Sequence, residues 1–174
     1  MKKTFIIGVM GGGKALPAHE KAAYNLGKLI AQRGWILLNG GRNSGIMEAS
    51  AKGAFENGGL TVGILPDNSD ARVSDYISVP IITGLGSARN WINVLSSHVV
   101  VACPGGAGTL SEIALALKSG KKVVLLDFDP GTGFDNYRRK KDLIFAETPQ
   151  EAIKNIKIIL KLLKNQDKTG GKII

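Results

Sequence analysis

The chain has 174 residues, 44% of them apolar, which suits one domain with a substantial core and is too few for two ordinary domains. Its apolar runs have strand length, far below the roughly 20 residues of a membrane-spanning helix, and no export signal follows Met1. One cysteine excludes an intrachain disulfide, and two histidines offer no cluster with metal-ligand spacing. We therefore expect a cytoplasmic protein with no membrane partner, no metal site and no required cofactor.

The net charge of +9 is concentrated near the carboxyl end. Residues 1–137 carry 13 basic and 10 acidic groups, whereas residues 138–174 carry 10 and 4. The densest basic cluster is Arg138-Arg139-Lys140-Lys141. Such a cluster can bind nucleic acid or a phosphorylated ligand, or form solvated surface. Because few aromatic residues interrupt it, we favour solvated surface and do not expect a nucleic-acid partner.

Strand and helix patterns alternate along the chain. Strands are predicted over 4–10, 35–39, 60–65, 76–82, 98–103, 122–128 and 143–145. Helices are predicted over 17–33, 85–97, 110–119 and 149–164, and a further helix runs from the second glycine loop to about residue 57. This alternation predicts an α/β fold: a Rossmann-like, doubly wound, mostly parallel sheet of about six to seven strands with helices on both faces. Residues 1–165 form the single predicted domain, and 166–174 the predicted frayed tail.

Three glycine-rich loops follow the first, second and fifth predicted strands. In a parallel sheet these strand ends share one edge, where ligands bind, so the loops are predicted to surround one crevice. No loop has the spacing of a dinucleotide fingerprint or a P-loop, which disfavours NAD, FAD and P-loop nucleotide triphosphatases. The candidate phosphate- and nucleotide-binding residues in the loops are Gly12, Gly13, Gly40, Gly41, Ser44, Gly45, Met47, Gly105, Gly106, Gly108 and Thr109.

The third loop, 104–112 with the sequence PGGAGTLSE, joins a strand to a helix. Its glycines allow close approach, and the free N–H groups at a helix start favour an anion, so a phosphate is the predicted guest. Glu112 falls on nearly the same helix face as Thr109, either as a functional carboxylate or as half of a capping box. Arg89, in an otherwise neutral predicted helix at the same edge, is its candidate partner, or else a surface arginine.

These residues resemble the Lonely Guy family, also called lysine decarboxylase-like proteins. The family's marks are a Pro-Gly-Gly-x-Gly-Thr-x-x-Glu loop, an Arg-Lys pair before it and a Gly-Gly-Gly-x-x-Gly-Leu-Met loop, and the resemblance covers about residues 4–128. It implies a homodimeric or larger phosphoribohydrolase that cuts a nucleoside 5′-monophosphate into a free base and ribose 5-phosphate. The matching arginine and glutamate, Arg89 and Glu112, are then the catalytic pair.

The chain departs from this family pattern at four positions. Asn90, a further candidate binding residue, stands where the family has lysine, Arg42 replaces a loop glycine, Glu48 replaces a glycine after Met47, and Ser111 replaces the first of two glutamates. The pattern also resembles molybdenum-cofactor carrier proteins, which bind a phosphorylated pterin without turnover, and more distantly Smf/DprA-type DNA-processing domains. A small phosphorylated ligand is the expected partner, with hydrolysis as the first interpretation and carriage as the alternative. The broad apolar face of the last helix, with Ile158 and Leu162, indicates packing against the sheet or against a second subunit. Because several predicted helices carry apolar faces this broad, we expect a homodimer or larger assembly.

Overall fold

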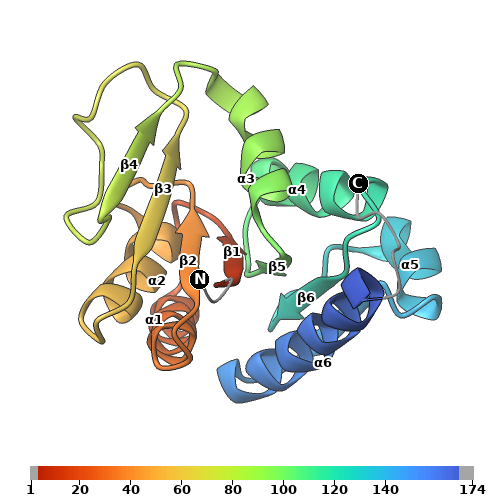
Figure 1. Ribbon diagram of the computed structural model, residues 1–174. Coiled ribbons are helices and arrows are strands. Elements are labelled where there is room, and N and C mark those ends of the chain that lie inside the picture. Colours follow the sequence, from red (N-terminus) through yellow and green to blue (C-terminus); the bar gives the residue numbers. More distant parts are fainter. Residues whose placement is uncertain (1–3, 169–174) are drawn as a thin grey trace.

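The computed structural model describes residues 4–168 and contains one parallel sheet of seven strands (Figure 1). The strands are β1 (Ile6–Met10), β2 (Ile36–Asn39), β3 (Thr61–Leu65), β4 (Val79–Ile82), β5 (Val99–Ala102), β6 (Val123–Leu126) and β7 (Leu143–Ala146). Their order is β4-β3-β2-β1-β5-β6-β7, with every pair parallel. The winding direction therefore reverses between β1 and β5, which confirms the predicted Rossmann-like, doubly wound fold.

Helices cover both faces of the sheet. They are α1 (Pro17–Ala31), α2 (Gly45–Phe55), α3 (Asn90–Ser96), α4 (Ala107–Lys118), α5 (Asp135–Arg139) and α6 (Pro149–Lys168), with 3₁₀ turns η1 (Gly86–Arg89) and η2 (Thr132–Phe134). One apolar layer joins α1, α2 and α6 to the sheet, and the other joins α3 and α4 to it. Every residue of β5 and β6 is buried because both faces of these central strands are covered.

Several predicted boundaries need correction. The predicted helix over 85–97 divides into η1 and α3, and α4 begins at Ala107, inside the glycine loop, instead of at Leu110. The short helix α5 was not predicted because five mostly polar and charged residues carry no apolar period. Helix α6 continues through Lys168, so the first part of the predicted tail is helical, and residues 169–174 lie outside the described part of the chain. Within residues 4–168, no helix has the length and apolar character needed to cross a membrane.

Candidate functional site

The three glycine loops meet by backbone contact at the switch point between β1 and β5. The Gly12 N–H donates to the Pro104 carbonyl at 3.0 Å, and the Ile46 N–H donates to the Gly12 carbonyl at 3.0 Å. Gly45 has φ +53°, and a side chain there would meet the backbone of Gly12 at 2.4 Å. A glycine is therefore required at position 45, both for the backbone conformation and for the approach of the first loop.

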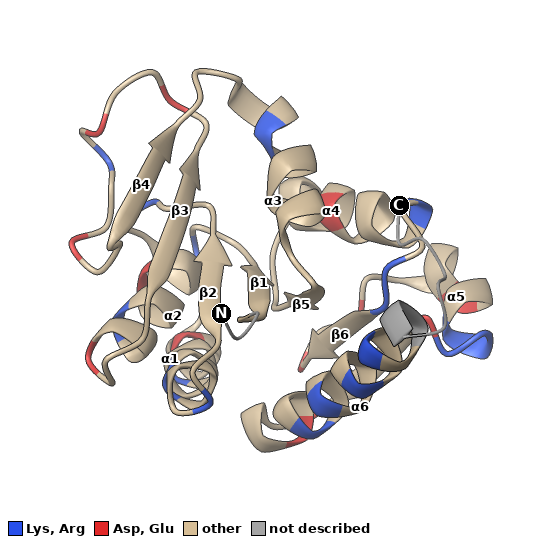
Figure 2. Cartoon of the chain, in the orientation of Figure 1, with Lys and Arg blue, Asp and Glu red and all other residues tan. Residues whose placement is uncertain are grey.

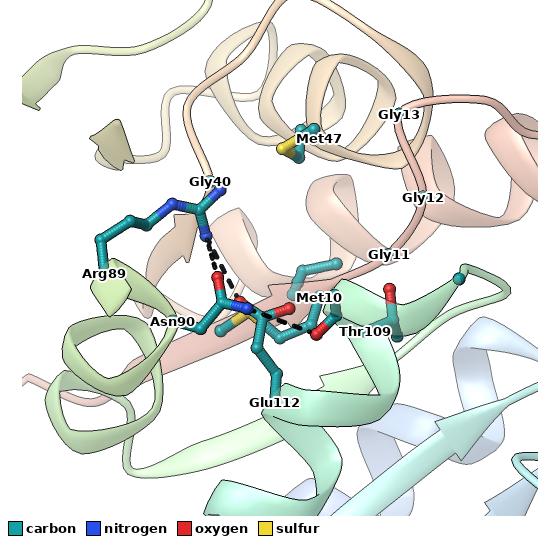
Figure 3. A pocket seen from close by; sticks show the side chains of 13 residues that line it. Met10, Gly11, Gly12, Gly13, Gly40, Met47, Arg89, Asn90, Thr109 and Glu112 are labelled. Atoms are coloured by element: carbon teal, nitrogen blue, oxygen red, sulfur yellow. Dashed lines mark hydrogen bonds and ion pairs between the residues drawn. The ribbon is translucent and has the colours of Figure 1, made fainter. Parts of the chain in front are cut away.

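A cavity of about 220 Å³ opens between these loops (Figure 3). Drug-sized ligands usually occupy about 300–1,000 Å³, so this space suits a compact group such as a sugar phosphate. Ten of the predicted site residues line it, namely Gly12, Gly13, Gly40, Met47, Arg89, Asn90, Gly106, Gly108, Thr109 and Glu112. The prediction missed three further lining residues, Val9, Met10 and Gly11. Of these, only Gly11 carried a signal, as part of the first glycine run.

The other four predicted residues, Gly41, Ser44, Gly45 and Gly105, are not among those that line the cavity. Gly41 has φ +76° and lies against Gly63, so it shapes the turn after β2. Gly105 lies within the third loop, where a Cβ would stand 2.1 Å from the Thr109 hydroxyl and 2.8 Å from the Gly12 nitrogen. The three glycines therefore allow the close approach of backbone within and between the loops, and Ser44 is the N-cap residue of α2.

The amino terminus of α4 lies at the cavity and has no side-chain cap. The N-cap residue is Gly106, and no side-chain hydrogen bond satisfies the first N–H groups of the helix. A Cβ at Gly106 or Gly108 would meet no atom within 4 Å, so the approach to these groups is open. The capping-box alternative is wrong, because the Glu112 carboxylate turns to α3 instead of to the start of its own helix. Uncapped N–H groups and the helix dipole together favour an anion here.

Arg89 and Glu112 form a buried ion pair across the cavity, as Figure 3 shows. Arg89 Nη1 lies 3.4 Å from Glu112 Oε1, and the two side chains are only 11% and 7% exposed. Burial lowers the pKa of Arg89, and Glu112 partly offsets this effect. Burial also raises the pKa of Glu112, against the opposing effects of Asn93 and Arg89. The surface-arginine alternative is therefore wrong, and the carboxylic acid can exchange a proton closer to neutral pH than an exposed glutamate.

Asn90 and Ser111, two of the departures from the family pattern, contact each other. Asn90 Nδ2 donates to Ser111 Oγ at 2.9 Å, and Asn90 Oδ1 accepts a hydrogen bond from Arg89 Nη1 at 3.0 Å. In the family pattern, a lysine at position 90 and a glutamate at position 111 would form a pair of opposite charges. The exchange for two neutral residues therefore leaves the net charge of this corner unchanged while it removes one cation from the cavity wall.

A third departure, Arg42, is not among the residues that line the cavity. Its guanidinium donates to both oxygens of Asp67 at 2.9 to 3.1 Å, and Arg72 contacts the same carboxylate. The hydrogen bonds from Arg42 hold the pKa of Asp67 below its usual range. Arg42 is therefore engaged in a structural ion pair beside the second loop. The described residues contain no group of three or more His, Cys, Asp or Glu side chains placed to hold a metal ion.

A family model described as "SLOG cluster4 family" matches residues 4–153. The chain belongs to the SLOG cluster4 family. A cytokinin riboside 5′-monophosphate phosphoribohydrolase from Mycobacterium tuberculosis is 34% identical over 135 residues, which are 71% of this chain and 71% of that protein. This relationship confirms the resemblance to the Lonely Guy phosphoribohydrolases.

Solved structures of molybdenum-cofactor proteins are more similar to this member of the SLOG cluster4 family. The molybdenum cofactor binding protein from Rippkaea orientalis is 49% identical, with a TM-score of 0.86 over 92% of this chain and 99% of that one. The Moco carrier protein from Chlamydomonas reinhardtii is 47% identical, with a TM-score of 0.84 over 91% and 99%. The DNA processing protein A from Helicobacter pylori is 20% identical with a TM-score of 0.65 over 92% and 81%, which shows a shared fold alone.

Proposed function

We propose that the cavity binds a small phosphorylated ligand, with its phosphate at the amino terminus of α4. Three features support this placement: the uncapped first turn, the open approach over Gly106 and Gly108, and the Arg89 guanidinium on the opposite wall. Backbone N–H groups and one arginine are sufficient to hold a phosphate. We therefore expect binding without a metal of the protein's own, so a chelator should not change the affinity for a nucleotide.

We infer that the protein acts as a carrier of the phosphorylated pterin of the molybdenum cofactor. The observation that carries this proposal is the 45–49% identity, over nearly the full length of both chains, to structures named for molybdenum-cofactor binding and carriage. The neutral Asn90–Ser111 pair also supports it. These two residues replace charged groups of the phosphoribohydrolase pattern, and Asn90 lines the cavity, so the exchange removes a charge from the cavity wall.

The Arg89–Glu112 pair favours a second candidate function, hydrolysis of a nucleoside 5′-monophosphate. In this reaction water adds across the bond between C1′ and the base nitrogen, the sugar carbon takes the hydroxyl group, and the base leaves with a proton. Glu112 would stabilise the positive charge that develops on the sugar and accept a proton from water. Arg89 would contact the phosphate and hold the carboxylate in place.

Two measurements on the same protein samples separate the two functions. Free base released from a panel of nucleoside 5′-monophosphates is measured by chromatography, and retention of molybdenum cofactor is measured as molybdenum that co-elutes with the protein in gel filtration. For a carrier we expect cofactor retention and no released base, from the parent and from Glu112→Gln alike. For a hydrolase we expect released base, which Glu112→Gln reduces by a factor of roughly 10² or more.

Two further variants are measured in both assays, one that should lose binding and one control. Arg89→Ala should weaken binding of either ligand, because it removes the arginine from the cavity wall. Gly133→Ala, at a position with no neighbour within 4 Å and outside the cavity, should change neither result. If the parent protein binds neither nucleotides nor the cofactor, the proposed ligand class is rejected.

A further inference from the structure

Asn93 is a buried polar residue behind the cavity that no motif singled out. It lies on α3, is fully buried, and its Nδ2 donates to Glu112 Oε1 at 2.8 Å. This hydrogen bond is shorter than the 3.4 Å contact between Arg89 and the same oxygen. The closest polar contact of Glu112 is therefore with an uncharged amide instead of with the arginine.

The two oxygens of Glu112 have different surroundings. Oε1 accepts from both Asn93 and Arg89, whereas Oε2 receives no hydrogen bond from any residue between 4 and 168. Although Oε2 has no hydrogen-bond partner among these residues, it is not fully buried. It is therefore in contact with the open space of the cavity that Glu112 lines. A proton on this carboxyl group would therefore sit on Oε2, because two donors already point at Oε1.

The orientation of the Asn93 amide follows from the same contact. With the amide reversed, its oxygen would lie against Glu112 Oε1, where two oxygen atoms repel unless one carries a proton. In the observed orientation, Asn93 Oδ1 is instead buried without a hydrogen-bond partner within the described residues. An unsatisfied buried acceptor is costly, so the contact with Glu112 must outweigh that cost.

We propose that Asn93 is a positioning residue for Glu112: its amide occupies Oε1 and so makes Oε2 the oxygen that exchanges a proton or a hydrogen bond with the bound ligand. The role of Oε2 toward a ligand rests on the proposed function, whereas the effect of Asn93 on Glu112 does not. The charged group that acts on Glu112 from η1 is Arg89, and Asn93 acts from α3. Both favour the ionised carboxylate, and burial opposes them.

The test is a titration of Glu112 in the ligand-free protein, followed by carbon NMR of the side-chain carboxyl. Asn93→Leu keeps the approximate shape but removes the donor, so we expect the pKa of Glu112 to rise by about one unit or more. Asn57→Leu is the matched control, because the Asn57 amide donates its hydrogen bond to Gly53 in α2 and has no contact with Glu112. An unchanged pKa of Glu112 in folded Asn93→Leu would overturn the proposal.

A second variant covers the case in which Asn93→Leu does not fold. Asn93→Asp has the same shape and should make a carboxyl pair that shares one proton, with a coupled titration step above that of the parent. A parent-like Glu112 titration in Asn93→Asp would also overturn the proposal.

Binding of AMP measured against pH then tests the ligand-facing role. The pH midpoint of AMP affinity should move in Asn93→Leu by the same amount as the pKa of Glu112, and an unmoved midpoint would reject the role assigned to Oε2. Absence of AMP binding by the parent would count against nucleotide as the ligand, and the titration of the free protein would still decide the part played by Asn93.

Discussion

At the scale of single residues, the site depends on a carboxyl group that the fold removes from water. Glu112 is an ordinary solvent-facing residue type, yet here it lies between Arg89 and Asn93 with a raised pKa. Burial disfavours the charged form, and the two donors reduce that effect.

The first prediction concerns the pH dependence of stability. A carboxyl group whose pKa is raised on folding binds more protons in the folded state, so its contribution to stability falls as pH rises from the unfolded value of about 4.3 to the folded value. Relative to Glu112→Gln, which does not titrate, the parent should lose unfolding free energy between pH 4 and pH 7. The loss is about 1.4 kcal/mol for each unit by which folding raises the pKa. Denaturant unfolding of both proteins at the two pH values measures it, and parallel curves would contradict it.

The second prediction concerns Gly40, which lies under the Arg89 guanidinium. A Cβ at position 40 would stand 2.6 Å from Arg89 Nη2 and 2.6 Å from the Met47 sulfur. Both neighbours are flexible side-chain ends, so Gly40→Ala should displace them instead of unfolding the protein. We expect phosphate-ligand affinity to fall by about tenfold, the effect of a lost contact of about 1.4 kcal/mol. Calorimetry measures the affinity, with Gly133→Ala as the control; unchanged affinity would show that Arg89 does not contact the ligand.

At the scale of elements, helices α1 and α2 meet at a distance that glycine sets. Helices α1 and α2 pack very closely. A Cβ at Gly27 would lie 2.1 Å from the carbonyl oxygen of Ser50, and a Cβ at Gly53 would lie 2.0 Å from the carbonyl oxygen of Tyr24. These neighbours are backbone atoms of the facing helix, which cannot rotate away. The pair carries the first two glycine loops, so its close packing also positions the cavity.

The third prediction uses one substitution at three helical glycines. Gly27→Ala and Gly53→Ala should each destabilise the protein by about 3 kcal/mol, because the added methyl forces two helix backbones apart. Gly108→Ala, in α4 with no neighbour within 4 Å, should instead stabilise it by about 0.5 kcal/mol through helix propensity. Denaturant unfolding without ligand measures all three. A gain in stability at position 27 or 53 would show that the helices can separate at little cost.

At the scale of the whole molecule, apolar and charged side chains remain on the surface of the single chain. Trp91 and Leu95, one turn apart on α3, are 40% and 47% exposed, and Ile158 and Leu162 on α6 are 52% and 47% exposed. Figure 2 shows a row of basic residues along α6, where Lys154, Lys157, Lys161 and Lys164 are exposed. Two copies joined through α6 would bring these lysines together, and repulsion would oppose the contact.

The fourth prediction is therefore a homodimer that forms through α3. Light scattering at micromolar concentration should give twice the chain mass of 18.4 kDa. Leu95→Lys should reduce the mass to that of one chain, because it places a charge in the apolar contact, whereas Leu162→Lys should leave the dimer intact. A monomeric parent would reject the assembly, and a monomer produced by Leu162→Lys alone would move the interface to α6.

The sequence alone determined the strand and helix alternation, the parallel sheet, the three loops at one edge and the choice of Arg89 and Glu112 as candidate site residues, which the structure places at the cavity. These features follow from local patterns: apolar period, glycine at strand ends and helix-forming runs. Only the tertiary structure decided that the cavity is lined without Gly41, Ser44, Gly45 and Gly105, and that Asn90 pairs with Ser111. It also decided that α4 starts uncapped at Ala107 and that Asn93 reaches Glu112 from another helix. The contacts of Asn90 with Ser111 and of Asn93 with Glu112 join residues 21 and 19 positions apart, and such contacts are not encoded in the local pattern around one residue.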